Sequence, residues 1–336
     1  MIKDIFSLIC TPAFLASVIR VTAPILFAAL GGIFASRSGI FNMALESMLL
    51  WAALVGVIVS AAVKKMVLGG LTMGQAGYEA ALSKANLFGC IAGFVCGVGV
   101  SVFVGLFLAY MGIKLRANLY LTGLAINTIS TGGTVFVLYL AAGEKGISTS
   151  LSSCTMPVIN IPIIKDIPII GEIISGQNLM VYIAFICIPI VHIIINKTTL
   201  GLRIRAVGEN ANAAESVGVD VQNIQFKALA LSGLFAGMGG ITLSMAAVSF
   251  FSRGMSAGKG FMAMSAMNVG KATPLGTAAA ALIFGVFDAA SNALKTLSIP
   301  TQFIAALPYA ATLVALVVFA IQSEKKARKI RALQDK

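Results

Sequence analysis

Long apolar runs separated by short polar segments dominate this chain from residue 12 to residue 322. A membrane-spanning helix needs about 20 mainly apolar residues. Runs of that kind cover residues 12–35, 40–63, 87–111, 119–141, 179–197, 226–249, 255–271, 276–296 and 303–322. Because the seventh run is short enough to re-enter the membrane instead of crossing it, the pattern predicts eight or nine transmembrane helices.

Two of these runs have the features of broken helices. The second begins with the polar stretch Gly39–Asn42, which predicts a break where its helix starts. The blocks Gly39–Met48 and Gly258–Asn268 are weakly alike and start at opposite membrane faces in the predicted topology. Opposed blocks of this kind are typical of the inverted repeats of transporters, so the sequence suggests such a repeat.

Composition supports a membrane protein. Of the 336 residues, 58% are hydrophobic and only 11% are charged, whereas soluble domains carry about 25% charged residues. No segment between the runs is long enough to form a hydrophobic core of its own. We therefore predict an all-α polytopic membrane protein whose residues 1–336 form a single transmembrane domain.

The net charge of +12 comes from basic residues between the apolar runs and at the C-terminus. This distribution is typical of a signal that orients membrane helices, and it leaves no basic domain to bind nucleic acid. More Lys and Arg residues fall on the cytoplasmic side when the C-terminus is placed there. We therefore predict a multi-pass protein with a basic cytoplasmic tail at residues 323–336.

The longest predicted cytoplasmic loop, residues 198–225, contains the pattern of a short helix. Asn212 suits the N-cap position, Glu215 follows three residues later as in a capping box, and Gly218 suits the residue that ends a helix. A helix this short is unstable in water unless it packs against something. The loop is therefore either a connector on the lipid headgroups or a docking element for a cytoplasmic partner.

Small apolar residues give this predicted helix a shallow apolar face, and two basic residues precede it. The apolar face consists of Ala213, Ala214 and Val217. Arg203 and Arg205 flank the helix on its N-terminal side.

The run from Gly201 to Gly218, with Arg203, Arg205, Gly208 and Asn210, resembles the coupling loop of ABC importer permeases of the branched-chain amino acid and ribose type. Three further blocks agree with this resemblance: Gly39–Met48, where Ser47 replaces the usual glycine; Leu115–Asn127; and Gly260–Gly276. The combination is most similar to the branch that imports nucleosides.

The resemblance implies a bacterial plasma-membrane importer built from several chains. A second, similar permease subunit would complete the pathway, and an extracytoplasmic lipoprotein would deliver the solute. Separate cytoplasmic ATPase subunits would bind ATP and Mg²⁺, so we expect no cofactor on this chain and no enzymatic activity. A Walker A loop is indeed not recognisable, since the nearest match, Gly254–Gly260, has the wrong spacing.

Polar residues inside the apolar runs are the candidates for the solute pathway, because polar groups in hydrocarbon face a cavity or a partner helix. Asn42 and Glu46 are spaced to lie one helical turn apart on one face, and Phe41 could stack on a base. The remaining candidates are Asn127, Asn268, Asp288 and Asn292. Each is also compatible with ordinary hydrogen bonding between helices, and Asn42 and Glu46 with bracing of a broken helix.

An ion-coupled secondary transporter of a small polar solute is the alternative. It would require ionisable groups placed for ion coupling, and Glu46 and Asp288 are the clear intramembrane acids. A membrane-embedded enzyme is disfavoured because one histidine and scattered acids make no catalytic or metal-binding constellation.

Overall fold

The computed structural model describes residues 11–69, 78–160, 170–295, 306–317 and 321. Seven of the described helical segments are long and apolar enough to cross a membrane. They contain α2 (Pro12–Arg37), α3 (Leu45–Leu68), α4 (Tyr78–Ala109) with the π-helix η1 (Tyr110–Lys114), α5 (Leu119–Ala142), α8 (Leu179–Lys197), α11 (Val221–Ile241) with the π-helix η2 (Thr242–Ala247), and α13 (Pro274–Leu294).

Shorter elements connect these helices. They are β1 (Val158–Ile159), α7 (Ile170–Ile174), β2 (Gln177–Asn178), α9 (Thr199–Glu209), α10 (Ala211–Ser216), α12 (Lys259–Val269) and an unlabelled helix at Ala306–Val317. The two strands pair antiparallel, with Val158 opposite Asn178. Most of the described residues are helical and only two short strands occur among them, which confirms the predicted all-α polytopic architecture.

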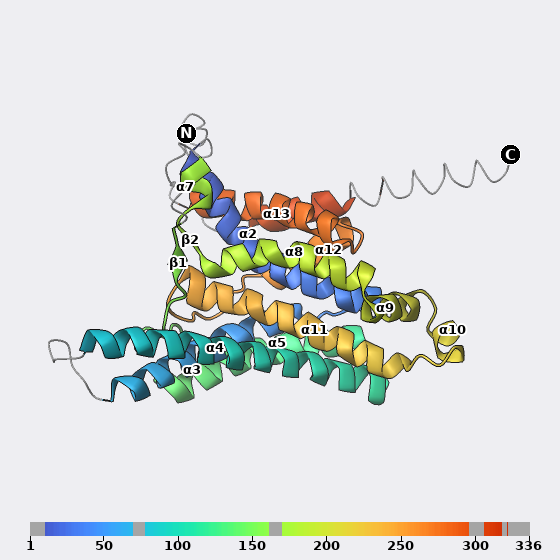
Figure 1. Cartoon of the computed structure of the whole chain (residues 1–336), viewed down its shortest axis with the longest axis horizontal. Coiled ribbons are helices and arrows are strands. Elements are labelled where there is room, and N and C mark those ends of the chain that lie inside the picture. The colour runs from blue at the N-terminus through green and yellow to red at the C-terminus, as the bar shows by residue number, and fades with distance from the viewer. Residues whose placement is uncertain (1–10, 70–77, 161–169, 296–305, 318–320, 322–336) are drawn as a thin grey trace.

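The helices α2 and α11 form the centre of the bundle (Figure 1). One group, α3, α4 and α5, lies on one side of this pair, and α8, α12 and α13 lie on the other. The elements α9 and α10 project from one end of the bundle, and α7 and the strands lie at the opposite end. Below, these are called the α9 end and the α7 end.

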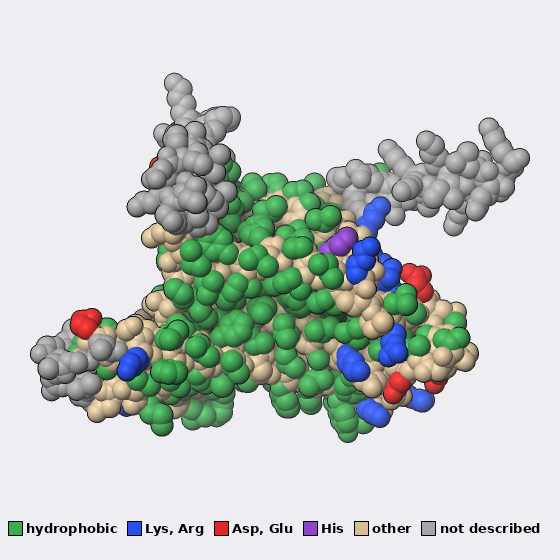
Figure 2. All heavy atoms as spheres, in the orientation of Figure 1, with side chains coloured by type: hydrophobic (Ala, Val, Ile, Leu, Met, Phe, Trp, Pro, Cys, Tyr) green, Lys and Arg blue, Asp and Glu red, His purple; other side chains and the backbone are tan. Residues whose placement is uncertain are grey.

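The surface matches a bilayer environment. Figure 2 shows hydrophobic side chains along the length of the bundle on the face in view, while charged side chains gather mainly at the α9 end. Many large apolar side chains are exposed on α4 and α5, including Phe103, Phe107, Ile129 and Phe136. Lipid contact accounts for these side chains, which water would not solvate favourably.

Close packing in the centre depends on small residues of α11. A Cβ atom at Gly233 would lie 2.7 Å from the carbonyl oxygen of Ser101 on α4. The Ser101 hydroxyl donates a hydrogen bond of 2.7 Å to the Gly233 carbonyl oxygen. Small residues permit such approaches between membrane helices, where backbone packing replaces the hydrophobic driving force.

The structure refines the predicted spans. The second helix begins at Leu45 and the preceding residues 40–44 are not helical, as the polar stretch predicted. The seventh run contains only the 11-residue α12, which is too short to cross a membrane. The described part of the ninth run is the helix at Ala306–Val317. The predicted basic tail at 323–336 lies outside the described residues.

Candidate functional site

The N-terminus of α3 is capped by side chains from outside that helix. The Asn42 Oδ1 accepts a hydrogen bond from the Ala44 N–H at 2.9 Å, and its Nδ2 donates to the Ser232 Oγ at 2.8 Å. Asn127 of α5 accepts from the Ser47 N–H at 3.0 Å and donates to the Met43 carbonyl at 2.7 Å. These contacts satisfy backbone groups that a helix start leaves without partners.

Replacing Asn127 with alanine is expected to lower the free energy of unfolding by about 1–3 kcal/mol, because the Ser47 N–H and the Met43 carbonyl then lose their partner. Thermal unfolding of the purified protein in detergent micelles measures the effect. Thr128→Ala is the matched control, since the Thr128 hydroxyl is exposed and bonds only within its own helix. Equal melting temperatures for the two variants would refute this capping role.

Glu46 lies between the starts of two helices. It belongs to the first turn of α3, and its carboxylate accepts three hydrogen bonds from the start of α12: from the Ser256 Oγ at 2.5 Å, the Gly258 N–H at 2.9 Å and the Gly260 N–H at 2.7 Å. The positive ends of both helix dipoles therefore face one carboxylate, which is the favourable position for an anion.

The approach to α12 is strained. Ala257 has φ of 45°, which is uncommon for a residue other than glycine, and Gly258 follows at φ of 74°. Together these left-handed residues turn the chain so that the N–H groups of Gly258 and Gly260 point at Glu46. Strain of this kind persists where surrounding contacts hold it, and it concentrates at functional sites.

The contact between Glu46 and the start of α12 is called the Glu46 junction below. An ion pair lies beside this junction. The Lys259 Nζ is 2.9 Å from the Asp288 Oδ2, and the two side chains are only 12% and 10% exposed. Lys259, which falls within the predicted run 255–271, is the first residue of α12 and pairs with α13. Both intramembrane acids, Glu46 and Asp288, therefore have partners within the chain.

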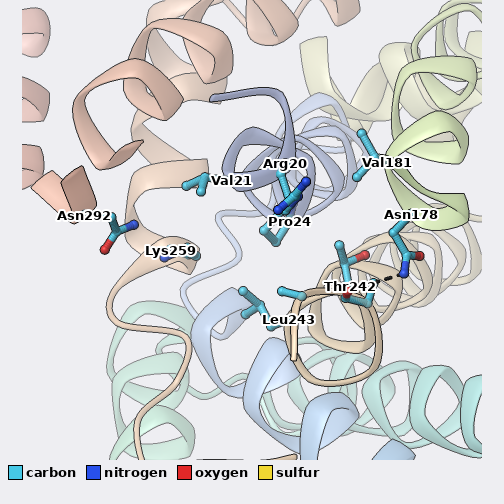
Figure 3. A pocket seen from close by; sticks show the side chains of 11 residues that line it. Arg20, Val21, Pro24, Asn178, Val181, Thr242, Leu243, Lys259 and Asn292 are labelled. Atoms are coloured by element: carbon cyan, nitrogen blue, oxygen red, sulfur yellow. Dashed lines mark hydrogen bonds between the residues drawn. The ribbon is translucent and has the colours of Figure 1, made fainter. Parts of the chain in front are cut away.

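A cavity of about 180 Å³ lies next to the ion pair, where α2, α8, η2, α12 and α13 meet. Figure 3 shows Arg20, Lys259, Asn178, Thr242 and Asn292 around it, together with apolar side chains. The apolar part of the lining consists of Val21, Pro24, Val181, Leu243, Ala246 and Ala247. Mostly apolar walls with a few convergent polar groups are typical of small-molecule sites.

The π-helix η2 supplies four of the residues that line the cavity. A π-helical turn widens the backbone and is frequent at functional sites. Asn178 of β2 stabilises this segment, since its Nδ2 donates a hydrogen bond of 3.3 Å to the Ala246 carbonyl. Arg20 is held at the rim by a hydrogen bond of 3.3 Å from its Nε to the Gln177 Oε1.

The structure distributes the sequence-predicted pathway residues over several places. Asn42 and Asn127 cap α3, Glu46 caps α12, Asp288 pairs with Lys259, and Asn292 lines the cavity. Phe41 is 40% exposed, and Asn268 lies in a different pocket near the α9 end. The prediction that Asn42 and Glu46 share a helical face was wrong, because α3 begins after Asn42.

The predicted coupling helix exists as α10, but its start differs. Asn210, not Asn212, is the N-cap, and its Oδ1 accepts from the Ala213 N–H at 3.0 Å. The predicted capping box with Glu215 is therefore absent from this helix. Gly218 does follow the helix in a left-handed conformation, with φ of 84°. The 11-residue helix α9 before it was not predicted.

The predicted apolar face of α10 is divided in two. Ala214 is buried against the protein, whereas Ala213 and Val217 are exposed, Val217 by 79%. The prediction that Ala214 shares one apolar face with Ala213 and Val217 was therefore wrong. Ala213 and Val217 are four residues apart, so they present a small apolar patch to the outside at the α9 end. Arg203 is exposed nearby on α9, and Arg205 is partly buried.

The chain belongs to the family described as branched-chain amino acid transport system / permease component, whose model matches residues 14–321. It is therefore a multi-pass membrane transport subunit, and not an enzyme. Membership of this family supports the hypothesis of an ABC importer permease over that of an ion-coupled secondary transporter. The matched residues include the Glu46 junction, the cavity and α10.

Individual relatives agree with this assignment. The chain is 29% identical over 311 residues to the nucleoside ABC transporter permease NupC of Lactococcus lactis. The matched residues make up 90% of this chain and 91% of the relative. It is 31% identical over 304 residues to the guanosine ABC transporter permease NupQ of Bacillus subtilis, covering 88% of each. A more distant relative is the glucose ABC transporter permease TsgB13 of Haloferax volcanii, 23% identical over 289 residues, covering 84% of this chain and 70% of the relative. No solved structure matches the chain.

Proposed function

We propose that this chain is the permease subunit of an ATP-driven nucleoside importer of a bacterial plasma membrane. The observation that carries the proposal is the nearly full-length similarity to two permeases whose names specify nucleoside and guanosine transport. The similarity to a glucose permease is lower and covers less of the relative. Nucleosides and sugars share a hydroxylated ring, and only the nucleoside also offers a flat base.

The cavity beside the Lys259–Asp288 pair has the chemistry for such a solute. The Asn292 Nδ2 can donate to a ring hydroxyl or base edge, and the side-chain oxygens of Thr242 and Asn178, whose own donors bond within the chain, can accept from one. The apolar residues around them provide a surface on which a base can lie. Glu46 and Asp288 are occupied by partners within the chain, so in this proposal they hold the helices that form the pathway rather than carry ions.

The exposed patch of α10 is the proposed contact for the ATPase. Ala213 of this six-residue helix and Val217 at its C-cap are exposed, while Ala214 and the Asn210 cap anchor the helix. Such a helix gains stability when a partner groove covers its apolar side. In this proposal the α9 end is cytoplasmic, ATP and Mg²⁺ bind to the ATPase subunits, and this chain binds no cofactor. A second permease subunit and a solute-binding lipoprotein complete the importer.

Transport assays test the proposal directly. The chain is co-expressed with its partner permease and ATPase subunits, and uptake of radiolabelled guanosine and glucose is measured in membrane vesicles with and without ATP. Uptake of guanosine that requires ATP supports the proposal. Uptake of glucose alone would reassign the solute, and guanosine uptake driven by an ion gradient without ATPase subunits would refute the importer.

The double variant Ala213→Asp with Val217→Asp is expected to reduce ATP-dependent uptake by at least about tenfold, because two carboxylates would have to be buried in the ATPase groove. Co-purification of the ATPase subunit with the permease gives the second readout. The charge-matched control is Gln222→Glu with Asn223→Asp, which adds acids at the exposed start of α11, where the helix dipole tolerates them. Equal uptake by both variants would show that α10 is not the docking element.

A further inference from the structure

A second pocket, of about 280 Å³, lies at the α9 end and is separate from the cavity described above. It forms where Arg37, the last residue of α2, meets Arg205 of α9 and Lys271 in the turn between α12 and α13. The end of α2 and the start of α13 lie toward the α9 end of the bundle (Figure 1). The residues that line the pocket therefore lie where membrane-spanning helices begin and end.

The lining of this pocket is strongly basic. Three cations, Arg37, Arg205 and Lys271, face it together with one acid, Glu209. Ser36 and Asn268 add neutral hydrogen-bonding groups. With one carboxylate against three cations, the pocket carries excess positive charge and suits an anion.

One of these cations has a donor without a partner. The Arg205 Nε is buried, and no hydrogen-bond acceptor reaches it among the described residues. Leaving a buried charged donor unpaired costs more than leaving a neutral one. A guanidinium offers a fork of donors whose geometry matches the oxygens of a phosphate. An anion in the pocket would supply the acceptor that Arg205 lacks.

Arg37 shapes the pocket instead of serving as a free donor. Its Nε donates to the Ala272 carbonyl at 3.0 Å and its Nη2 to the Lys271 carbonyl at 3.2 Å. Lys271 and Ala272 both adopt left-handed conformations, with φ of 56° and 48°. Two consecutive residues of this kind are strained, and the Arg37 guanidinium holds the turn that places Lys271 at the pocket.

We propose that this pocket binds the phosphate of an anionic phospholipid headgroup. Basic pockets between transmembrane helices at the membrane boundary bind such headgroups, and the lining of this pocket includes Arg37, where the membrane-spanning helix α2 ends. The site joins three segments distant in sequence: the end of α2, helix α9 and the α12–α13 turn. The proposal depends on the membrane embedding of the chain and not on its solute.

Binding is tested on the full chain in detergent micelles. Phosphatidylglycerol is the probe, phosphatidylcholine is the zwitterionic comparison with no net charge, and glycerol phosphate is the free anion. Thermal unfolding and native mass spectrometry report binding. We expect phosphatidylglycerol to raise the melting temperature more than phosphatidylcholine does. In Arg205→Gln with Lys271→Gln, the apparent affinity for phosphatidylglycerol should fall about tenfold or more, because each basic residue adds to the attraction.

The matched control is Arg203→Gln with Lys227→Gln, which removes two exposed charges at the same end of the bundle. It should bind phosphatidylglycerol like the original protein. Stabilisation by glycerol phosphate that Arg205→Gln also abolishes would assign the pocket to free phosphates instead of the lipid. Equal affinity of pocket and control variants, or no preference over phosphatidylcholine, would overturn the proposal. If the double variant does not fold, Arg205→Gln alone provides the same comparison.

Discussion

Replacing Glu46 with alanine is expected to lower the free energy of unfolding by about 3–9 kcal/mol, because three donors at the start of α12 lose a charged acceptor, each at about 1–3 kcal/mol. The effect is large because two helix N-termini meet at this partly buried carboxylate. Chemical and thermal unfolding in detergent micelles measure the loss, and transport should be abolished with it.

Two further variants separate the charge of Glu46 from its position. Glu46→Gln keeps one acceptor oxygen and should lose less stability than the alanine variant. Gly260→Ala leaves the carboxylate intact, but its Cβ would lie 2.5 Å from the Glu46 backbone nitrogen and 2.6 Å from the Glu46 Cα, so the helices must separate. Glu79→Ala is the control, because Glu79 is exposed at the start of α4. A loss in the control equal to that in Glu46→Ala would contradict the role of this junction.

The second large effect is expected at the Lys259–Asp288 pair. Lys259→Met and Asp288→Leu should each lower the free energy of unfolding by about 3–5 kcal/mol, because each leaves a charge in a poorly hydrated site without its partner. The double variant should recover most of this loss, since neither charge then remains. Unfolding of the four proteins gives a double-mutant cycle whose coupling energy reports the pair directly.

The same four proteins also distinguish a structural pair from an ion-coupling device. If the pair holds α12 against α13, the double variant should still transport guanosine when ATP is supplied. If Asp288 carried a coupling ion, the double variant would fold and yet fail to transport. Additive losses in the two single variants would show that the side chains do not interact.

The sequence was sufficient for the architecture because apolar length determines which segments cross a bilayer. The break before α3 was also predictable, since Gly39 and Asn42 interrupt an apolar run. The partners of Glu46 were not, because two of its three donors are backbone N–H groups more than 200 residues away in the chain. Side-chain patterns do not show where a backbone donor will lie.

The error at α10 has a local cause. Asn210 and Asn212 are equally good N-cap residues, and the capping-box pattern selected the second. The choice depended on where the preceding helix ends. That helix, α9, was not predicted because it is not apolar enough for a span and because its N-cap, Thr198, also ends α8, so no loop separates the two helices. The partner of Asp288 was not predicted either, because Lys259 belongs to a different helix and sequence patterns do not show which helices pack together.

Asn210 is at once the residue that ends α9 and the residue that begins α10. The joint between the two helices is thus one residue long, and one residue spans at most about 3.6 Å when extended. Its backbone is already extended, with φ of −156° and ψ of 101°. The joint therefore cannot lengthen when α10 is displaced, so a displacement of α10 must also move α9.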